Sequence, residues 1–161
     1  MKNGGIIGYK PFNKRHIALI FVSNSNDNYA DVKFEDIEPI VKDCKKKNKN
    51  YKVYFCYLTY DFIKIVKSEY VYEVHIFGHG KVDALGFEDG VFQYRELRHT
   101  EPKDFVAQWH CNHGGKIEHS LGYLIGKEYY VPYGIIFTPD IPNKVEKLIN
   151  GKLKPTKNPN L

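Results

Sequence analysis

The segment "VYEVHIFGHGKVDALGFEDGVFQY" (71–94) decides the fold of this chain. It opens with an apolar run that is rich in β-branched and aromatic residues, which predicts a buried strand at 71–77. The run ends on Gly78-His79-Gly80, and "EDG" then separates two short apolar runs, a pattern typical of a β-hairpin. A later segment, "DFVAQWHCNHGG" (104–115), has the same pattern: a predicted strand ends at Cys111, with glycines just beyond. We therefore interpret the two strand ends as parts of one site.

Buried strands alternate with amphipathic helices along the rest of the chain. Because parallel strands need helical crossovers, this order predicts an α/β fold with a mainly parallel sheet and helices on both faces. The 161 residues fit one domain, which we place at 1–150, followed by a flexible C-terminal tail at 151–161. The predicted strands are 16–22, 51–58, 71–77, 104–110 and 133–139, and the predicted helices are 31–47, 61–69, part of 114–126, and 141–149.

Composition and charge narrow the class of protein. No apolar run approaches the ~20 residues of a membrane span, and the first residues lack the apolar core of a signal peptide. The three cysteines are odd in number and have no close CxxC spacing, which fits a reducing compartment; we expect a cytoplasmic protein. The net charge of +5 comes largely from lysine clusters, and no base-stacking motif accompanies them. We therefore predict neither a nucleic-acid nor a membrane partner.

The residues at the two strand ends suggest nucleophilic catalysis. In parallel sheets, sites form just beyond the carboxyl ends of the strands, where His79 and Cys111 both lie in the sequence. If the two strands are neighbours about 4.8 Å apart, an imidazole could reach the thiol and stabilise its thiolate. The backbone N–H groups of Gly80 and Cys111 could then stabilise an oxyanion.

The chain resembles the caspase-like cysteine peptidases, a group that includes caspases, metacaspases, clostripain-like enzymes and CHAT domains. The resemblance rests on "VHIFGHG" (74–80), "EDGVFQYREL" (88–97) and "EPKDFVAQWHCNHGG" (101–115). It implies a caspase-like three-layer α/β sandwich and a cysteine endopeptidase that cleaves a protein substrate, a peptide or itself. His79 matches the general base of the family, Cys111 the nucleophile, and Gly80 an oxyanion-hole glycine. No cofactor and no metal are implied.

The same resemblance suggests residues that contact the substrate. In caspases an arginine near the first strand helps to build the specificity pocket, and Arg15 is the candidate here. The caspase signature carries a glutamine two residues before the nucleophile; here Trp109 takes that position and Gln108 lies one residue earlier. These two residues and His113, which follows the nucleophile, are the further candidates. The family also forms dimers along an edge strand. By the same resemblance, the strand predicted at 133–139 would be the edge at which a homodimer, or an association with a larger assembly, forms.

The sequence leaves two alternatives open. "HCNH" (110–113), together with His75, His79 and His119, supplies nitrogen and sulfur ligands of the kind that zinc prefers. The chain could instead be a caspase-like interaction module without catalytic activity. We predict that His75 lies in the core, that His99 lies on the surface, and that Cys44 and Cys56 are packing residues.

Overall fold

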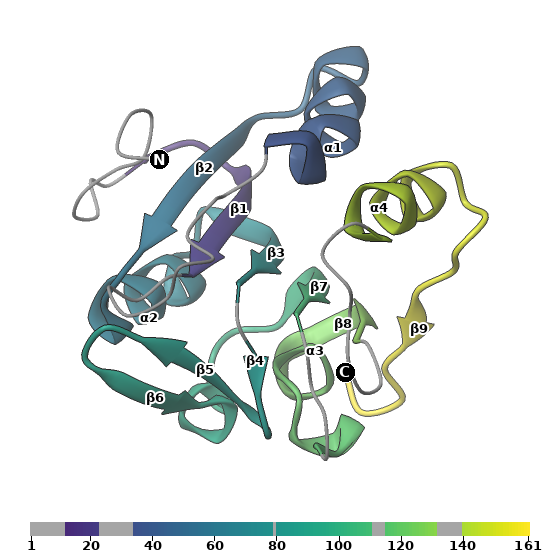
Figure 1. Cartoon of the computed structure of the whole chain (residues 1–161). Helices are drawn as coiled ribbons and strands as arrows, with labels where there is room; N and C mark the ends of the chain where they lie inside the picture. Colours follow the sequence, from purple (N-terminus) through teal and green to yellow (C-terminus); the bar gives the residue numbers. More distant parts are fainter. Residues whose placement is uncertain (1–11, 23–33, 79, 111–114, 132–139) are drawn as a thin grey trace.

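The computed structural model describes residues 12–22, 34–78, 80–110, 115–131 and 140–161 (Figure 1). Strands and helices alternate along this chain, as the sequence predicts. The elements are β1 (His16–Val22), α1 (Phe34–Lys46), β2 (Tyr51–Cys56), α2 (Thr59–Lys67), β3 (Val71–Phe77), β4 (Gly80–Lys81), β5 (Ala84–Phe87), β6 (Gly90–Gln93), the 3-10 helix η1 (Tyr94–Leu97), β7 (Lys103–Trp109), the 3-10 helix η2 (Ile117–His119), α3 (Leu121–Ile125), β8 (Gly126–Tyr130), α4 (Ile141–Ile149) and β9 (Thr156–Lys157).

A six-stranded sheet forms the centre of the described structure, in the order β2-β1-β3-β7-β8-β9. The strands β2, β1, β3, β7 and β8 run parallel to one another, and only β9 runs antiparallel to its neighbour. The segment after β3 forms a separate antiparallel sheet, β4-β5-β6, whose β5–β6 hairpin is the one that "EDG" predicts. The predicted α/β class with a mainly parallel sheet is confirmed.

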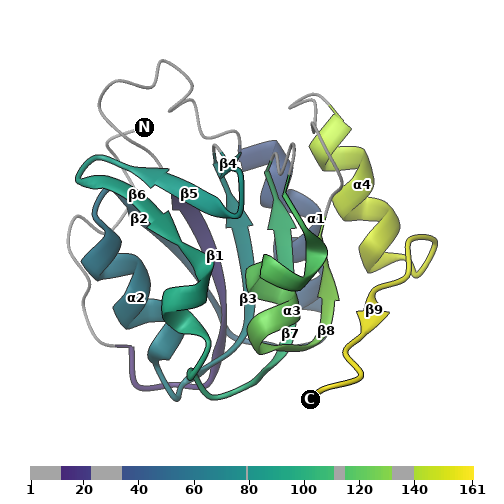
Figure 2. The ribbon, with the colours of Figure 1, turned by 90° about the horizontal axis from the view of Figure 1, so that it is seen from below.

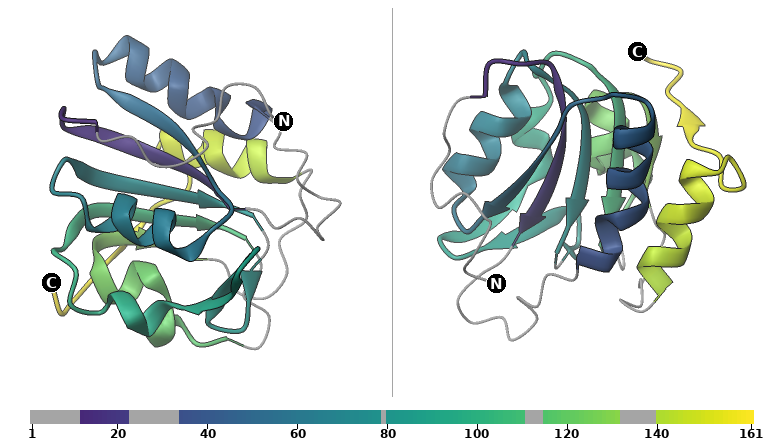
Figure 3. Two further views of the ribbon diagram at one scale, coloured as in Figure 1. Left: turned by 90° about the vertical axis from the view of Figure 1, so that its left-hand side faces the viewer. Right: turned by 90° about the horizontal axis from the view of Figure 1, so that it is seen from above.

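Side chains on both faces of the large sheet are buried, which explains the continuous apolar runs of the sequence. Alternate residues of β1 enter two separate clusters. Ala18, Ile20 and Val22 pack with α2, α3 and the small sheet, whereas Leu19 and Phe21 pack with α1 and α4. Figures 2 and 3 show these helix pairs on opposite sides of the sheet. The arrangement is compatible with a three-layer α/β sandwich.

The helix α1 follows the predicted amphipathic pattern. Ile37, Ile40 and Cys44 are buried at the predicted spacing, with acidic residues in the first turn and lysines in the last, which complements the helix dipole. Pro39 lies inside the helix rather than at its start. No helix in the described ranges is long and apolar enough to cross a membrane.

The last parallel strand of the sheet differs from the prediction. The segment 114–126 is helical in part, as predicted, with η2 and α3 inside it, but Gly126 already begins a strand that was not predicted, β8. β8 has no continuous apolar run in the sequence, because it contains the charged residues Lys127 and Glu128. The strand buries mainly Gly126 and Tyr129. The strand predicted at 133–139 lies outside the described residues.

The C-terminal segment is anchored to the sheet, in contrast to the flexible tail that its polar composition predicts. β9 pairs with β8, and the backbone N–H of Asn158 donates to the Lys127 carbonyl at 2.8 Å. The Asn158 side-chain amide is buried and donates to the carbonyls of Tyr123 at 2.6 Å and Gly126 at 2.9 Å. These carbonyls lie at the end of α3, where helical backbone acceptors lack partners, so one asparagine satisfies them and holds the segment in place.

Candidate functional site

The two strands that end near the predicted catalytic residues are direct neighbours. β3 and β7 pair in parallel, and their register runs from Glu73 opposite Phe105 to Phe77 opposite Trp109. His79, Cys111 and His113 lie outside the described residues. Gly80 is described: it begins β4 and pairs with Leu85 in the small sheet. The structure therefore brings together the two strands that precede His79 and Cys111.

Gly78 has a steric reason to be glycine. Its φ is +150°, and a Cβ at this position would lie 2.5 Å from the carbonyl oxygen of Val22 at the end of β1. Any other residue would have to displace backbone, because real Cβ atoms do not approach an oxygen so closely. The glycine before His79 thus lets the chain leave β3 close against the end of the neighbouring strand.

Trp109, predicted to contact substrate, is instead a core residue. Its side chain is fully buried and stacks on Tyr130 with ring centroids 4.8 Å apart. The indole Nε1–H donates to His75 Nδ1 at 3.2 Å, so the proton of this imidazole is on Nε2, which donates to Glu73 Oε1 at 2.7 Å. His75 is buried as predicted, and the pair fixes the end of β7 against β3.

Gln108, also predicted to contact substrate, is fully buried on the opposite face of β7. Its Oε1 accepts the Gly122 N–H at 2.9 Å, which leaves its amide group to donate to His110 Nε2 at 3.1 Å. The Tyr94 hydroxyl lies 3.2 Å from the same His110 nitrogen and donates to the Ala84 carbonyl at 3.2 Å. Burial raises the pKa of Tyr94 well above its usual range, so this phenol stays protonated. The network ties the end of β7 to the small sheet and to α3.

Arg15 lies at the wrong edge of the sheet for the predicted specificity role. It precedes β1, whereas the candidate site follows the carboxyl end of the parallel strand β3. Its guanidinium donates to Asp104 Oδ2 at 2.9 Å, near the start of β7, and lies 4.3 Å from the centroid of the Tyr72 ring. These contacts make Arg15 a surface ion-pair residue at the amino edge.

The described cysteines are packing residues, as predicted. Cys44 and Cys56 are both buried and free. Burial raises the pKa of Cys44 to about 11 and raises the pKa of Cys56 further still. Both thiols are therefore protonated and weakly nucleophilic at neutral pH.

The histidines of the zinc alternative do not converge where the structure describes them. Both ring nitrogens of His75 are used by Trp109 and Glu73, on the face of the sheet opposite the His110 network. Within the described ranges, no three histidine, cysteine or acidic side chains form a group that could hold a metal ion. His99 is exposed, as predicted, and accepts a hydrogen bond from Arg98.

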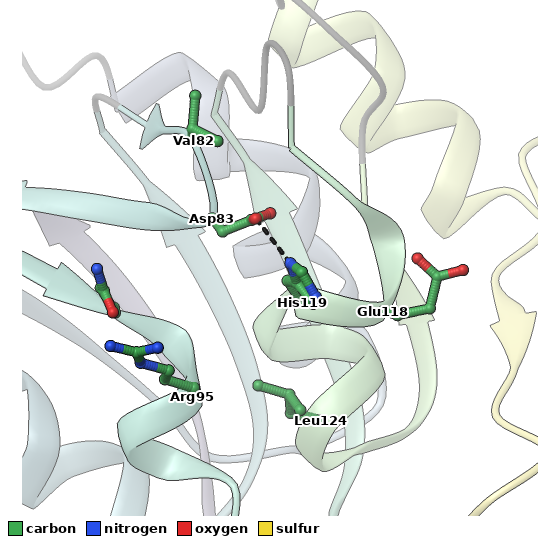
Figure 4. A pocket seen from close by; sticks show the side chains of 7 residues that line it. Val82, Asp83, Arg95, Glu118, His119 and Leu124 are labelled. Carbon is green, nitrogen blue, oxygen red and sulfur yellow. Dashed lines mark hydrogen bonds and ion pairs between the residues drawn. The ribbon is translucent and has the colours of Figure 1, made fainter.

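A pocket of about 290 Å³ lies between the small sheet and the segment η2–α3 (Figure 4). Asp83, at the turn between β4 and β5, accepts from His119 Nδ1 at 2.8 Å through Oδ2 and from the Lys116 N–H at 3.0 Å through Oδ1. The pair could not be recognised in the sequence, because Asp83 lies in a turn and His119 in η2, 36 residues apart, and the two share no motif. The lining residues are Val82, Asp83, Gln93, Arg95, Glu118, His119 and Leu124.

No family model matches this chain, and no curated protein matches it. Its function must therefore be argued from its own residues.

Proposed function

We propose that the protein is a cysteine endopeptidase of caspase-like fold, with His79 and Cys111 as its catalytic pair. One observation carries the proposal: Phe77 and Trp109 lie opposite each other in adjacent parallel strands. His79 and Cys111 each follow these partners by two residues in the sequence. Adjacent strands lie about 4.8 Å apart, a spacing that allows an imidazole and a thiol to reach each other.

The chemistry requires only these side chains and two backbone donors. The His79 imidazole takes the proton of the Cys111 thiol, and the thiolate attacks the carbonyl carbon of a peptide bond. The N–H groups of Gly80 and Cys111 stabilise the oxyanion while His79 protonates the leaving amine. Water then hydrolyses the thioester: His79 takes the water proton, the acid product leaves, and the thiol is restored.

The small sheet supports the placement of the histidine. β4 begins at Gly80, directly after His79, and pairs with β5, which in turn pairs with β6. The hairpin is fastened to α2 by Asp89, whose carboxylate accepts from the backbone N–H of Thr59 at 3.1 Å and from its hydroxyl at 2.8 Å. A loop that leaves β3 and is held at its far end in this way is suited to presenting a catalytic side chain.

The substrate we propose is a protein or peptide, with self-cleavage included, and no cofactor takes part. Cytoplasmic location belongs to the same proposal, and the buried free thiols of Cys44 and Cys56 support it. Gln108, Trp109 and Arg15 have no substrate-binding role in this proposal, because the first two are buried and the third lies at the amino edge.

The test is the alkylation rate of each cysteine by iodoacetamide against pH, followed by mass spectrometry of the peptides. Cys44 and Cys56 serve as internal standards, because their raised pKa values predict slow reaction. We expect Cys111 to react much faster below pH 7 in the unaltered protein, and to lose that advantage in His79→Ala. His99→Ala, which removes an exposed histidine, is the matched control and should leave the rate unchanged. Slow alkylation of Cys111, or equal rates with and without His79, would refute the proposal.

A further inference from the structure

The pocket beside the small sheet offers hydrogen-bond donors that no described residue of the chain engages. Both carboxylate oxygens of Asp83 are engaged, one by His119 Nδ1 and the other by the Lys116 N–H. The Glu118 carboxylate points away from this pair in Figure 4. The Asp83 carboxylate is therefore paired with His119, and the Arg95 guanidinium is the cationic group that the lining offers to a ligand.

Arg95 and His119 are available to a ligand. Among the described residues no acid forms an ion pair with the Arg95 guanidinium, which is exposed at the start of η1. The bond to Asp83 holds the His119 ring with Nδ1 toward the carboxylate, and this leaves Nε2, which can donate to an anion only when the imidazole is protonated, for another partner. Gln93 adds a side-chain amide to the same lining. A planar guanidinium with neighbouring donors is the usual protein partner of a carboxylate.

We propose that this pocket binds a carboxylate carried on a short aliphatic stem. A single negative charge fits better than a phosphate dianion, because Asp83 keeps a negative charge within the lining. Val82 and Leu124 supply apolar walls against which methylene groups can pack. The volume of about 290 Å³ suits one side chain or a small free acid rather than a larger cofactor. The carboxylate comes from a glutamate or aspartate side chain of a peptide, or from a free short-chain acid.

The site is separate from the proposed peptidase chemistry, and the proposal does not depend on that chemistry. Every lining residue lies in the described structure, on β6, η1, η2, α3 and the turn before β5. The turn that carries Asp83 begins directly after β4. A bound acidic group would therefore lie next to the segment that leads from His79, whether or not the thiol is active.

Binding can be measured by isothermal titration calorimetry on the full chain carrying Cys111→Ala, so that hydrolysis cannot interfere. The probes are an acetylated and amidated Ala-Ala-Glu-Ala peptide, the same peptide with glutamine in place of glutamate, and butyrate, a monocarboxylate. We expect the glutamate peptide or butyrate to bind, and the glutamine peptide to bind at least about tenfold more weakly than the glutamate peptide because it lacks the charge. Binding of butyrate alone would identify the ligand as a free acid, and binding of the glutamate peptide as a side chain. Equal binding of the two peptides, or no binding of either acidic probe, would overturn the proposal.

Variants assign the binding to the pocket. Arg95→Gln should weaken binding about tenfold or more, and Arg95→Lys should keep part of the affinity because it keeps the charge but loses the planar fork. Arg98→Gln removes another exposed arginine that lies three residues further along and outside the lining, so it should bind like the parent protein. His119→Gln gives a second, independent loss if Arg95→Gln proves unstable in circular dichroism. Unchanged affinity in both Arg95→Gln and His119→Gln would refute the site.

Discussion

Phe77 and Trp109 lie opposite each other at the ends of β3 and β7, with ring centroids 6.4 Å apart and planes inclined by 18°. The contact joins the last paired residues of the two strands that lead to His79 and Cys111. Trp109 is held further by its hydrogen bond to His75 and its stacking on Tyr130. The spacing of the two strand ends is therefore set by a buried aromatic cluster, which makes that cluster the first target for mutation.

Trp109→Phe should destabilise the fold by about 1–3 kcal/mol, because it leaves the buried His75 Nδ1 without its donor while it keeps an aromatic ring in place. The measurement is the free energy of unfolding in urea. Unfolding is monitored by far-ultraviolet circular dichroism, which reports on the backbone and does not depend on the tryptophan. Tyr130→Phe is the matched control: it retains the ring that stacks on Trp109 and should change stability by much less. Equal effects of the two substitutions would show that the indole hydrogen bond contributes little.

Gly78→Ala should be more harmful than a glycine substitution at another positive-φ site. A methyl group at residue 78 meets the Val22 carbonyl, in addition to the backbone strain of about 1–3 kcal/mol for an unusual φ. Gly151 separates the two causes, because its φ is +74° but no atom lies within 4 Å of an added Cβ. We expect Gly78→Ala to lower the urea midpoint clearly more than Gly151→Ala does. Similar midpoints for the two variants would remove the steric argument.

Much of the fold could be predicted from the sequence, because the relevant signals are local. The apolar run of β1 and the helical spacing of α4 give the observed boundaries, His16–Val22 and Ile141–Ile149. β8 and β9 escaped prediction for a physical reason. β8 carries Lys127 and Glu128, and β9 has only two residues, whose order depends on the hydrogen bonds of Asn158 to distant carbonyls.

The candidate site was only partly predictable. The sequence left it as a condition that β3 and β7 are neighbours, and the sheet order confirms this premise of the predicted His79–Cys111 pair. The sequence did not show that the side chains of Gln108 and Trp109 point into the core rather than into the site. Both residues lie just before the site, but on a strand whose two faces are both buried. The Asp83–His119 pair arises from tertiary packing alone.

Asp89→Ala should weaken the attachment of the hairpin to α2, which also packs on the hairpin through Phe62. The helix receives no side-chain cap from Leu58, which precedes it, and Asp89 takes that role by accepting from the Thr59 N–H and hydroxyl. Losing a capping carboxylate costs about 0.5–2 kcal/mol, measured as the free energy of unfolding. Glu88→Ala removes the neighbouring exposed acid and should be nearly neutral. A Glu88→Ala loss as large as that of Asp89→Ala would indicate a general charge effect instead.

His16 should make the fold sensitive to acid. Its Nδ1–H donates to the Lys14 carbonyl at 2.6 Å, so Nε2 is unprotonated and accepts from the Tyr54 hydroxyl at 2.8 Å. Burial is the main cause that lowers the pKa of His16 below its usual 6.5. As pH falls through about 6.5, His16 therefore binds a proton in the unfolded chain but not yet in the folded chain. This group then lowers the free energy of unfolding by up to about 1.4 kcal/mol per pH unit.

The measurement is the free energy of unfolding from pH 7.5 to 5 for the unaltered protein, His16→Gln and, as a control, His99→Gln. Glutamine keeps a donor and an acceptor but cannot be protonated in this range. The stability advantage of the unaltered protein over His16→Gln should be largest above pH 6.5 and shrink as the pH falls. The difference between the unaltered protein and His99→Gln should change little, because His99 is exposed. An advantage over His16→Gln that stays constant or grows toward pH 5 would mean that folded His16 accepts a proton as readily as the unfolded chain does.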